Sequence, residues 1–312
     1  YSINKDIYEM NLSELEGALR YMECGTLHRV MNVVSNTKVY SRWAYDNNYS
    51  KKQDSEFNPI LSSDYYINFV QNSNTFYLTR NELLNYLDAI PNYLIKASLL
   101  AIFEGIGGRG YQELSNIKSS DIFKDGNQWY VNLRNELDRS IRRRHPISHQ
   151  LRDFLVLAND ETTFKGIDGK TKYDLIESDY IFRYFISRRN VGMQKVLSGS
   201  KADAKLYETY LRYFREAFQL SKAGLKFSLK ELKYSGLMHY LNTELDKQKD
   251  NHLVTTEVID GLANRFILPT QNTGGKEYTV YSKVKVMISP SFMQEVYGKN
   301  LRFDFSRTAK LV

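Results

Sequence analysis

The chain of 312 residues is 42% hydrophobic and 13% aromatic, which is typical of a folded globular protein, excludes a disordered chain and leaves room for two domains. A single cysteine, Cys24, excludes an internal disulfide, and five scattered histidines without a cysteine pair argue against a zinc or iron site. The net charge of +7 and the pI near 9.1 favour a polyanionic partner.

No apolar run reaches the roughly 18 residues of a membrane span, and the first residues carry no basic-then-apolar signal segment. From the sequence we expect a soluble, cytoplasmic protein with no membrane partner, no cofactor and no metal.

The first block, residues 1–75, is predicted to be a helical domain. Leu12, Leu15, Leu19 and Met22 recur at helical spacing. A second apolar set predicts one or two further helices and consists of Val30, Val33, Val34, Val39, Tyr40 and Trp43. The pair Asn58–Pro59 then breaks the pattern, and residues 62–76 are expected to connect the two blocks.

The second block, residues 76–312, is predicted to be mostly helical. Thr79 and Glu82 have the spacing of a capping box, in which both side chains satisfy free backbone N–H groups at a helix start. Residues 92–103 predict a buried helix, and residues 207–218 and 229–241 predict two more.

A small sheet is expected within this block. Trp129, Val131 and Leu133 alternate with polar residues as in a half-buried strand, and residues 142–147 are predicted to pair with it. The predicted fold class is therefore mainly α with a small antiparallel β-sheet (α+β).

Gly105, Gly107 and Gly110 match GxGxxG, the phosphate-binding fingerprint of dinucleotide-binding folds. That fingerprint requires a strand before the glycines and a long helix after them. Here a helix is predicted before them, and only about two helical turns fit after them. We therefore interpret the glycines as a turn between two helices.

The densest basic run contains four arginines in six positions, namely Arg139, Arg142, Arg143 and Arg144. Most charge runs are solvated, and the plain interpretation of this one is a solvated hairpin tip. Because neighbouring guanidinium groups repel one another unless an anion lies against them, we favour phosphate contact for this run.

Five segments, in order along the chain, resemble the tyrosine recombinases, the phage integrase family. Residues 113–122 (ELSNIKSSDI) are similar to the tail of the first active-site box of that family. Residues 77–83 are similar to the start of the catalytic domain, and residues 129–148 are similar to its hairpin. Residues 223–241 are similar to the helix with the H-x-L-R-H box, and residues 258–265 to the helix before the L-G-H box.

This resemblance implies a helical core-binding domain in residues 1–75 and an integrase catalytic-like domain in residues 76–312. Members of the family cut DNA with a tyrosine that attacks a phosphodiester, assisted by two arginines, a histidine or tryptophan, and a hairpin lysine. Tyr281 or Tyr278 would supply the tyrosine, although Tyr281 is also interpreted as packing on a strand with Val280 and Val284.

Two departures from the family pattern lie in the first box and the hairpin. Gly110 stands where the first arginine belongs, and Arg109 is one residue early, which on a helix turns the side chain by about 100° away from the phosphate. A one-residue bulge through the glycines would restore it. The hairpin lysine is missing, because no lysine lies between Lys124 and Lys165.

Two further departures lie downstream. Lys230 occupies the first position of the H-x-L-R-H box and Lys233 the place of its arginine, where a lysine cannot offer the bidentate fork of a guanidinium group. Asn264 stands where the family has histidine. Removing one electrostatic stabiliser reduces a rate by roughly two to three orders of magnitude, so we expect these vestigial positions not to support catalysis.

The expected function is a sequence-specific DNA-binding regulator of transcription, built on a recombinase scaffold that has lost catalysis. A resemblance to the integrase-like repressors that maintain lysogeny in SPβ-type prophages implies a repressor. Its expected partner is double-stranded DNA. The candidate contacts are Arg29, Lys38 and Arg42 in the helical domain and Arg109, Arg139, Arg142, Arg143, Arg144, Lys230 and Lys233 in the larger one.

Two alternatives remain open. One is an active recombinase in which Arg109 bulges inward, Lys233 serves as the second cation and Tyr281 attacks. The other is a protein-interaction module whose tail, residues 289–312, docks on a partner or on a second copy.

Overall fold

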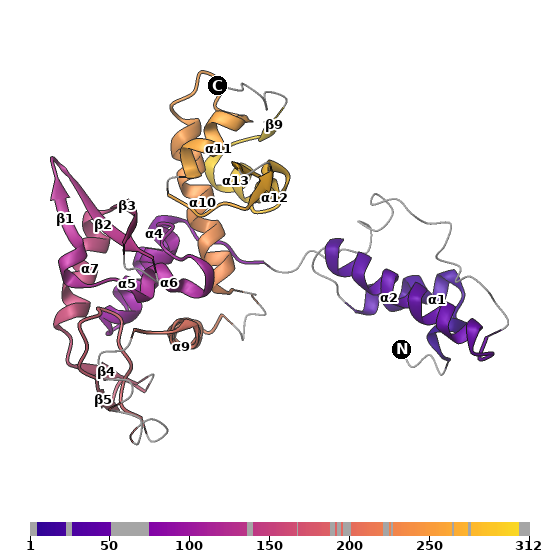
Figure 1. Ribbon diagram of the computed structural model, residues 1–312, viewed down its shortest axis with the longest axis horizontal. Coiled ribbons are helices and arrows are strands. Elements are labelled where there is room, and N and C mark those ends of the chain that lie inside the picture. The colour runs from indigo at the N-terminus through magenta and orange to yellow at the C-terminus, as the bar shows by residue number, and fades with distance from the viewer. Residues whose placement is uncertain are drawn as a thin grey trace. The chain divides into compact units, whose positions relative to one another are not determined.

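The computed structural model describes residues 5–22, 27–50, 75–135, 140–166, 168–187, 191, 195, 201–220, 225, 227–263, 265–273 and 276–305. Backbone contacts divide the chain into two compact units, Tyr1–Thr75 and Phe76–Val312 (Figure 1). The proline break at Asn58–Pro59 and most of the connection predicted in residues 62–76 lie outside the described residues.

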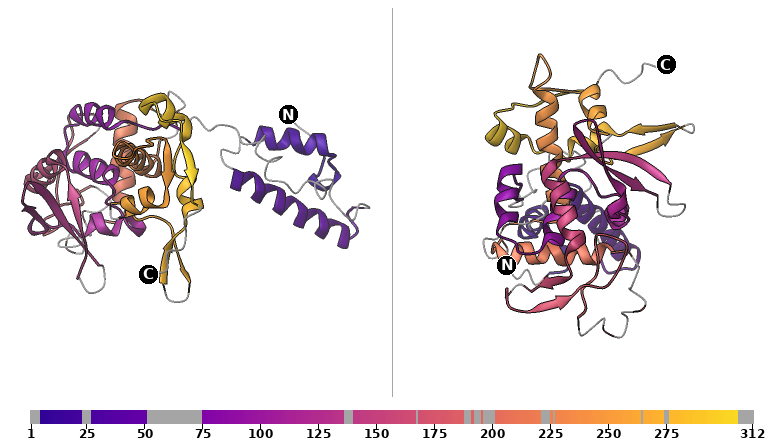
Figure 2. Two further views of the ribbon diagram at one scale, coloured as in Figure 1. Left: turned by 90° about the horizontal axis from the view of Figure 1, so that it is seen from above. Right: turned by 90° about the vertical axis from the view of Figure 1, so that its left-hand side faces the viewer.

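The described residues of the first unit form a 3₁₀ turn, η1 (Ile7–Glu9), and two helices, α1 (Leu12–Tyr21) and α2 (Leu27–Asp46). Figure 2 shows the two helices side by side. Leu15 and Leu19 of α1 pack with Val30 and Val34 of α2 in a small core, so the predicted helical character is confirmed.

In the C-terminal half of α2, the structure contradicts the prediction that Val39 and Trp43 belong to a buried apolar face. Val39 is 69% exposed and Trp43 is 48% exposed. The buried positions follow one helical stripe, which consists of Val30, Val34, Thr37, Ser41 and Ala44. Since each residue turns the helix by about 100°, this stripe directs residues 39 and 43 toward solvent.

The second unit is built around α5 (Tyr93–Phe103), in which every residue except Tyr93 is buried. It packs against α7 (His149–Asp160), α9 (Ala204–Ala217) and α10 (Leu229–Leu245). The predicted buried helix is confirmed, and so is the capping box that starts α4, where the Thr79 side chain accepts from Glu82 N at 3.1 Å and Glu82 accepts from Thr79 N at 2.8 Å. The described helices are α4 (Arg80–Asp88), α5 (Tyr93–Phe103), α6 (Gln112–Ser115), α7 (His149–Asp160), α9 (Ala204–Ala217), α10 (Leu229–Leu245), α11 (Thr256–Ala263), α12 (Tyr281–Lys285) and α13 (Pro290–Tyr297), with 3₁₀ turns η3 (Arg109–Tyr111) and η4 (Ser119–Asp121).

Three strands, β1 (Ile122–Asp125), β2 (Gln128–Arg134) and β3 (Ile141–Ile147), form an antiparallel sheet in the order β1-β2-β3. Val131 of β2 lies opposite His145 of β3, which confirms the predicted pairing and, with the helices, the α+β class. Figure 1 shows this sheet beside α7.

Short strand pairs complete the described sheets. Two are antiparallel, β4 (Thr163–Lys165) with β5 (Lys172–Asp174) and β7 (Thr270–Thr273) with β8 (Lys276–Thr279). The third, β6 (Leu253–Thr255) with β9 (Arg302–Asp304), is parallel and was not predicted.

Helix α10 joins the two hydrophobic cores of this unit. Leu229 and Leu232 belong to the core around α5, whereas Leu237 and Leu241 belong to the core formed with α11, α12 and α13. At Gly236 the helix lies against the backbone of α5 so closely that an added Cβ would be 1.7 Å from the Phe103 carbonyl oxygen. None of the helices in the described ranges has the length and apolarity needed to cross a bilayer.

We expect Gly236→Ala to destabilise the protein by about 1–3 kcal/mol, because the new methyl group must push α10 away from α5. Urea unfolding of the full chain measures this loss. Gly261→Ala is the matched control, since the nearest atom to its added Cβ is a Glu244 side-chain oxygen at 3.8 Å. In helix α11 this change should stabilise by about 0.5–1 kcal/mol. Equal midpoints for the two variants would contradict the close contact at Gly236.

Candidate functional site

The start of α10 places two lysines at one helix end. Ser228 caps the helix and forms a reciprocal capping box with Glu231, so the helix begins at Leu229. Lys230 is exposed, and its ammonium lies 5.4 Å from the centre of the Tyr234 ring. Lys233, about one turn further, is half-buried, and its Nζ donates to the carbonyl oxygen of Ile267 at 3.1 Å.

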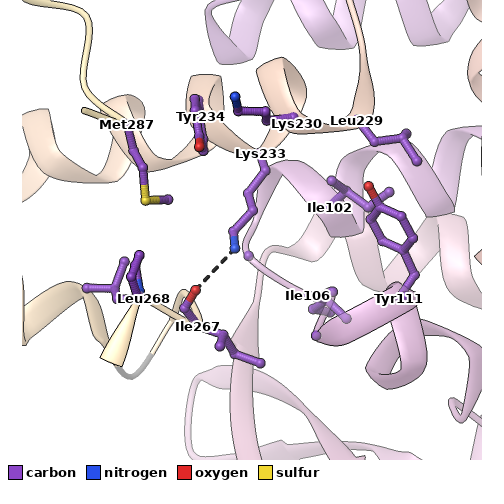
Figure 3. Close-up of a pocket in the computed structure, with 15 residues that line it drawn as sticks. Ile102, Ile106, Tyr111, Leu229, Lys230, Lys233, Tyr234, Ile267, Leu268 and Met287 are labelled. Atoms are coloured by element: carbon purple, nitrogen blue, oxygen red, sulfur yellow. Dashed lines mark hydrogen bonds between the residues drawn. The ribbon is translucent and has the colours of Figure 1, made fainter. Parts of the chain in front are cut away.

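These lysines border a pocket of about 510 Å³ (Figure 3). Its walls are the glycine loop, residues 105–110, the first turns of α10, and residues 267–269. Figure 3 shows the Lys233 side chain extending across the pocket toward Ile267, with Ile106 and Tyr111 on the side of the glycine loop. The pocket therefore combines two cationic groups with apolar walls.

Burial lowers the pKa of Lys233, and the positive charge of Arg143 lowers it further, whereas the carboxylate of Glu113 raises it. Burial is the largest of these effects because a desolvated ammonium loses its hydration. Glu113 and Arg143 therefore lie close enough to the pocket to act on Lys233.

The sequence predicted the glycine loop as a turn between helices, but not the length of the helix that follows it. The loop follows α5 and precedes the single turn of α6, so the interpretation as a turn between helices is confirmed, although the helix after it is shorter than the two turns expected. Gly105 has a φ of 102°, and a Cβ there would lie 2.4 Å from the carbonyl oxygen of Arg265, so the position requires glycine.

The junction between Arg109 and α6 is not helical. Gly110 and Tyr111 both have left-handed backbone angles, with φ of 61° and ψ of 24° and 28°. The offset of one residue therefore does not turn Arg109 by the 100° of a helix, and the prediction based on that angle is wrong at this junction. The Arg109 side chain lies outside the described part of the chain.

Arg143 and Glu113 form an ion pair that contacts the glycine loop. Arg143 Nε donates to Glu113 Oε1 at 3.0 Å, and Arg143 Nη2 donates to Glu113 Oε2 at 2.8 Å. The side chains are 17% and 2% exposed. Glu113 also accepts from Gly107 N at 3.2 Å, so this carboxylate is part of the loop structure.

The arginine run of the hairpin is divided by the alternation of the strand. Arg142 and Arg144 of β3 are exposed, and the Arg144 guanidinium lies 5.6 Å from the centre of the Phe123 ring. Arg143, between them, faces inward beside Leu133 and contacts Glu113. Arg139 lies outside the described residues.

Three residues that were not predicted from the sequence form a hydrogen-bonded group next to this ion pair. The Arg265 guanidinium donates to the Pro146 carbonyl at 3.1 Å and lies 3.9 Å from the centre of the Tyr240 ring. Glu104 is fully buried, accepts from Ser148 N at 2.9 Å, and has a pKa raised by burial. His145 Nε2 lies 3.0 Å from the Glu104 carbonyl oxygen, and burial holds the His145 pKa well below its ordinary value.

A sequence signal existed for His145 but not for the other two. The two-residue period of a strand places His145 on the same inward face as Arg143 and Ile147. Nothing local distinguishes Glu104 or Arg265, because their partners lie about 40 or more positions away.

Tyr281 is on helix α12, so its interpretation as a strand residue was wrong. Its hydroxyl lies 2.9 Å and 3.1 Å from the two carboxylate oxygens of Asp260 and donates to that group. The ring stacks on Phe305 at 5.3 Å. Burial and the hydrogen bond to Asp260 raise the pKa of Tyr281 to about 12. Tyr281 is absent from the described residues that line the pocket.

The remaining candidate positions are only partly described. Asn264 and the side chains of Arg29 and Tyr278 lie outside the described part. On α2, Lys38 is half-buried and Arg42 is exposed. Within the described ranges, no three His, Cys, Asp or Glu side chains are grouped so as to hold a metal ion.

Two sequence matches to known proteins identify the family of this chain. A match over 188 residues, at 24% identity, is to the SPbeta prophage-derived uncharacterized protein YopR of Bacillus subtilis (strain 168). It covers 58% of this chain and 56% of YopR, so the chain spans little more than half of that relative. Residues 77–298 match the family model described as "MrpR, C-terminal catalytic domain", a tyrosine-recombinase-like domain. The chain therefore belongs to the MrpR C-terminal catalytic domain family.

Proposed function

We propose that this protein binds double-stranded DNA as a regulator of transcription and does not cut it. The observation that carries the proposal is the environment of Lys233, a cation in a pocket at the position where tyrosine recombinases have an arginine. An ammonium neutralises a phosphate as a point charge, but it lacks the two parallel donors of a guanidinium fork. A lysine at this position is therefore better suited to bind a DNA phosphate than to stabilise the pentavalent phosphate that forms during cleavage.

Exposed cations supply further phosphate contacts in this proposal. Lys230, Arg142 and Arg144 are exposed, and contacts of this kind to DNA phosphates need positive charge without a reactive geometry. In the first unit, Arg42 on α2 is exposed as well, whereas the half-buried Lys38 is a weaker candidate. Residues 1–75 and 76–312 would then act as two DNA-binding domains, a helical domain and an integrase-like domain.

The environment of Tyr281 supports binding without cleavage. A nucleophilic tyrosine must lose its proton during attack, and the adjacent Asp260 charge disfavours the phenolate. A pKa raised to about 12 leaves only a very small fraction of phenolate near neutral pH.

The regulatory role is proposed from the resemblance to lysogeny repressors with an integrase-like fold. The similarity to a prophage-derived protein supports a prophage context for this chain. The DNA target in this proposal is an operator within the same prophage.

A working recombinase is the competing proposal, because the matching family domain is described as catalytic. The two proposals differ in whether a covalent protein–DNA intermediate forms. A recombinase forms a covalent bond between a tyrosine and a DNA phosphate, whereas a repressor does not.

The full chain should bind fragments of its source prophage selectively and with an affinity that falls as salt rises. If Arg142 and Arg144 each contact one phosphate, Arg142→Ala and Arg144→Ala should each reduce the slope of log affinity against log salt by about 1. Fluorescence anisotropy across a salt series measures these slopes. Arg212→Ala, which removes an exposed arginine of α9 paired with Glu216, is the matched control and should leave the slope unchanged.

The same samples test cleavage. After denaturation, no protein should stay attached to the DNA, and Tyr281→Phe should bind as the parent chain does. A denaturation-resistant adduct that disappears in Tyr281→Phe would establish the recombinase instead. Absence of binding at low salt would contradict both proposals.

The proton of Tyr281 can be followed directly by NMR of ¹³Cζ-labelled tyrosine, with the signal assigned through its loss in Tyr281→Phe. We expect Tyr281 to titrate at about pH 12. Asp260→Asn should lower that pKa, because it removes a negative charge that disfavours the phenolate. An unchanged titration in Asp260→Asn would show that Asp260 does not control the tyrosine proton.

A further inference from the structure

The guanidinium group of Arg143 is occupied by protein acceptors on all of its nitrogens. Besides the two hydrogen bonds to Glu113, Nη1 donates to the Arg265 carbonyl oxygen at 2.8 Å and Nη2 donates to the Gly105 carbonyl oxygen at 3.1 Å. With 17% of its side chain exposed, Arg143 differs sharply from its neighbours Arg142 and Arg144. A phosphate would have to displace several of these hydrogen bonds to reach it.

Glu113 does not line the Lys233 pocket itself, but it is bound to the glycine loop that forms one wall of that pocket. Its carboxylate accepts from Gly107 N, and Gly107 and Lys233 both line that pocket. Without a positive partner this carboxylate would attract the Lys233 ammonium and repel an anion that enters the pocket. Arg143 is the described cation that neutralises it.

The same arginine also binds the segment that leads into another wall of the pocket, residues 267–269. Arg143 donates to the carbonyl of Arg265, and Lys233 donates to the carbonyl of Ile267, two residues further along the same segment. The position of the Lys233 acceptor is thus tied to the position of Arg143. Charge and geometry both connect Arg143 to Lys233.

We infer that Arg143 is a positioning residue for Lys233 and not a contact to DNA: it neutralises Glu113 and leaves the Lys233 ammonium to a phosphate of the duplex. The inference rests on the proposed DNA binding and specifies how the pocket takes part in it. The effects on the Lys233 pKa have the direction that this role requires, since Glu113 raises that pKa and Arg143 lowers it.

Three variants of the full chain distinguish neutralisation of Glu113 by Arg143 from a purely structural role of Arg143. Arg143→Met leaves Glu113 unpaired and should weaken DNA binding by about tenfold or more, because Lys233 becomes engaged by the carboxylate. Glu113→Gln alone should not weaken binding. The double variant Glu113→Gln/Arg143→Met removes both charges and should bind within about threefold of the parent, with the same salt slope.

Arg144→Met is the matched control on the same strand. As an exposed phosphate contact it should reduce the salt slope, and Glu113→Gln should not restore its binding. A double variant as weak as Arg143→Met alone would overturn the inference, and so would a reduced salt slope in the double variant.

If Arg143→Met does not fold, as judged by thermal unfolding, the double variant decides the question, because it leaves no buried charge unpaired. Binding by this folded variant that is tenfold or more weaker than that of the parent would then refute the inference.

A second readout does not depend on DNA. NMR titration of ¹³Cε-labelled lysine, with the Lys233 signal assigned through Lys233→Arg, should show the Lys233 pKa rising in Arg143→Met and returning toward the parent value in the double variant. This pattern together with an absence of DNA binding would refute the proposed function but retain the link between Arg143 and Lys233. A Lys233 pKa that does not respond to Arg143→Met would refute the link itself.

Discussion

The larger unit depends on a buried ion pair that joins segments far apart in the sequence. Arg143 from the hairpin binds Glu113 of α6, the carbonyl of Gly105 after α5, and the carbonyl of Arg265 after α11. Removing two charges from water is unfavourable unless each finds a close partner and the remaining donors are also satisfied. The left-handed Gly105, which admits the Arg265 carbonyl, makes this arrangement possible. The Lys233 pocket lies directly beside it and takes its shape from the same segments.

Local patterns predicted the elements that local forces determine. The Thr79 and Glu82 capping box starts α4, the apolar residues of α5 are buried, and the alternation along β2 marked its pairing with β3. The failure at Val39 has a simple cause, since counting apolar residues ignores their phase around the helix. The parallel pairing of β6 with β9 joins residues almost fifty positions apart, and no short pattern encodes it.

The candidate site was predictable in residue types but not in their orientation. The lysines of α10 were visible from the sequence, whereas the run of arginines did not reveal which guanidinium faces inward. The two-residue period of β3 contained that information, because it places Arg143 with His145 and Ile147. The successive left-handed residues Gly110 and Tyr111 could not be foreseen, since a tyrosine rarely adopts that backbone. Surrounding contacts determine such a conformation.

The pairing of β6 with β9 has a consequence for biosynthesis. The segment between these strands contains α11, α12 and α13, and β9 closes it only after residues 302–304 have left the ribosome. The core around α5 is made earlier and can form first, since chains fold in order of their emergence. Tyr281 contacts Asp260 of the same segment and Phe305, which follows β9. The surroundings of that tyrosine are therefore among the last parts of the unit to be assembled.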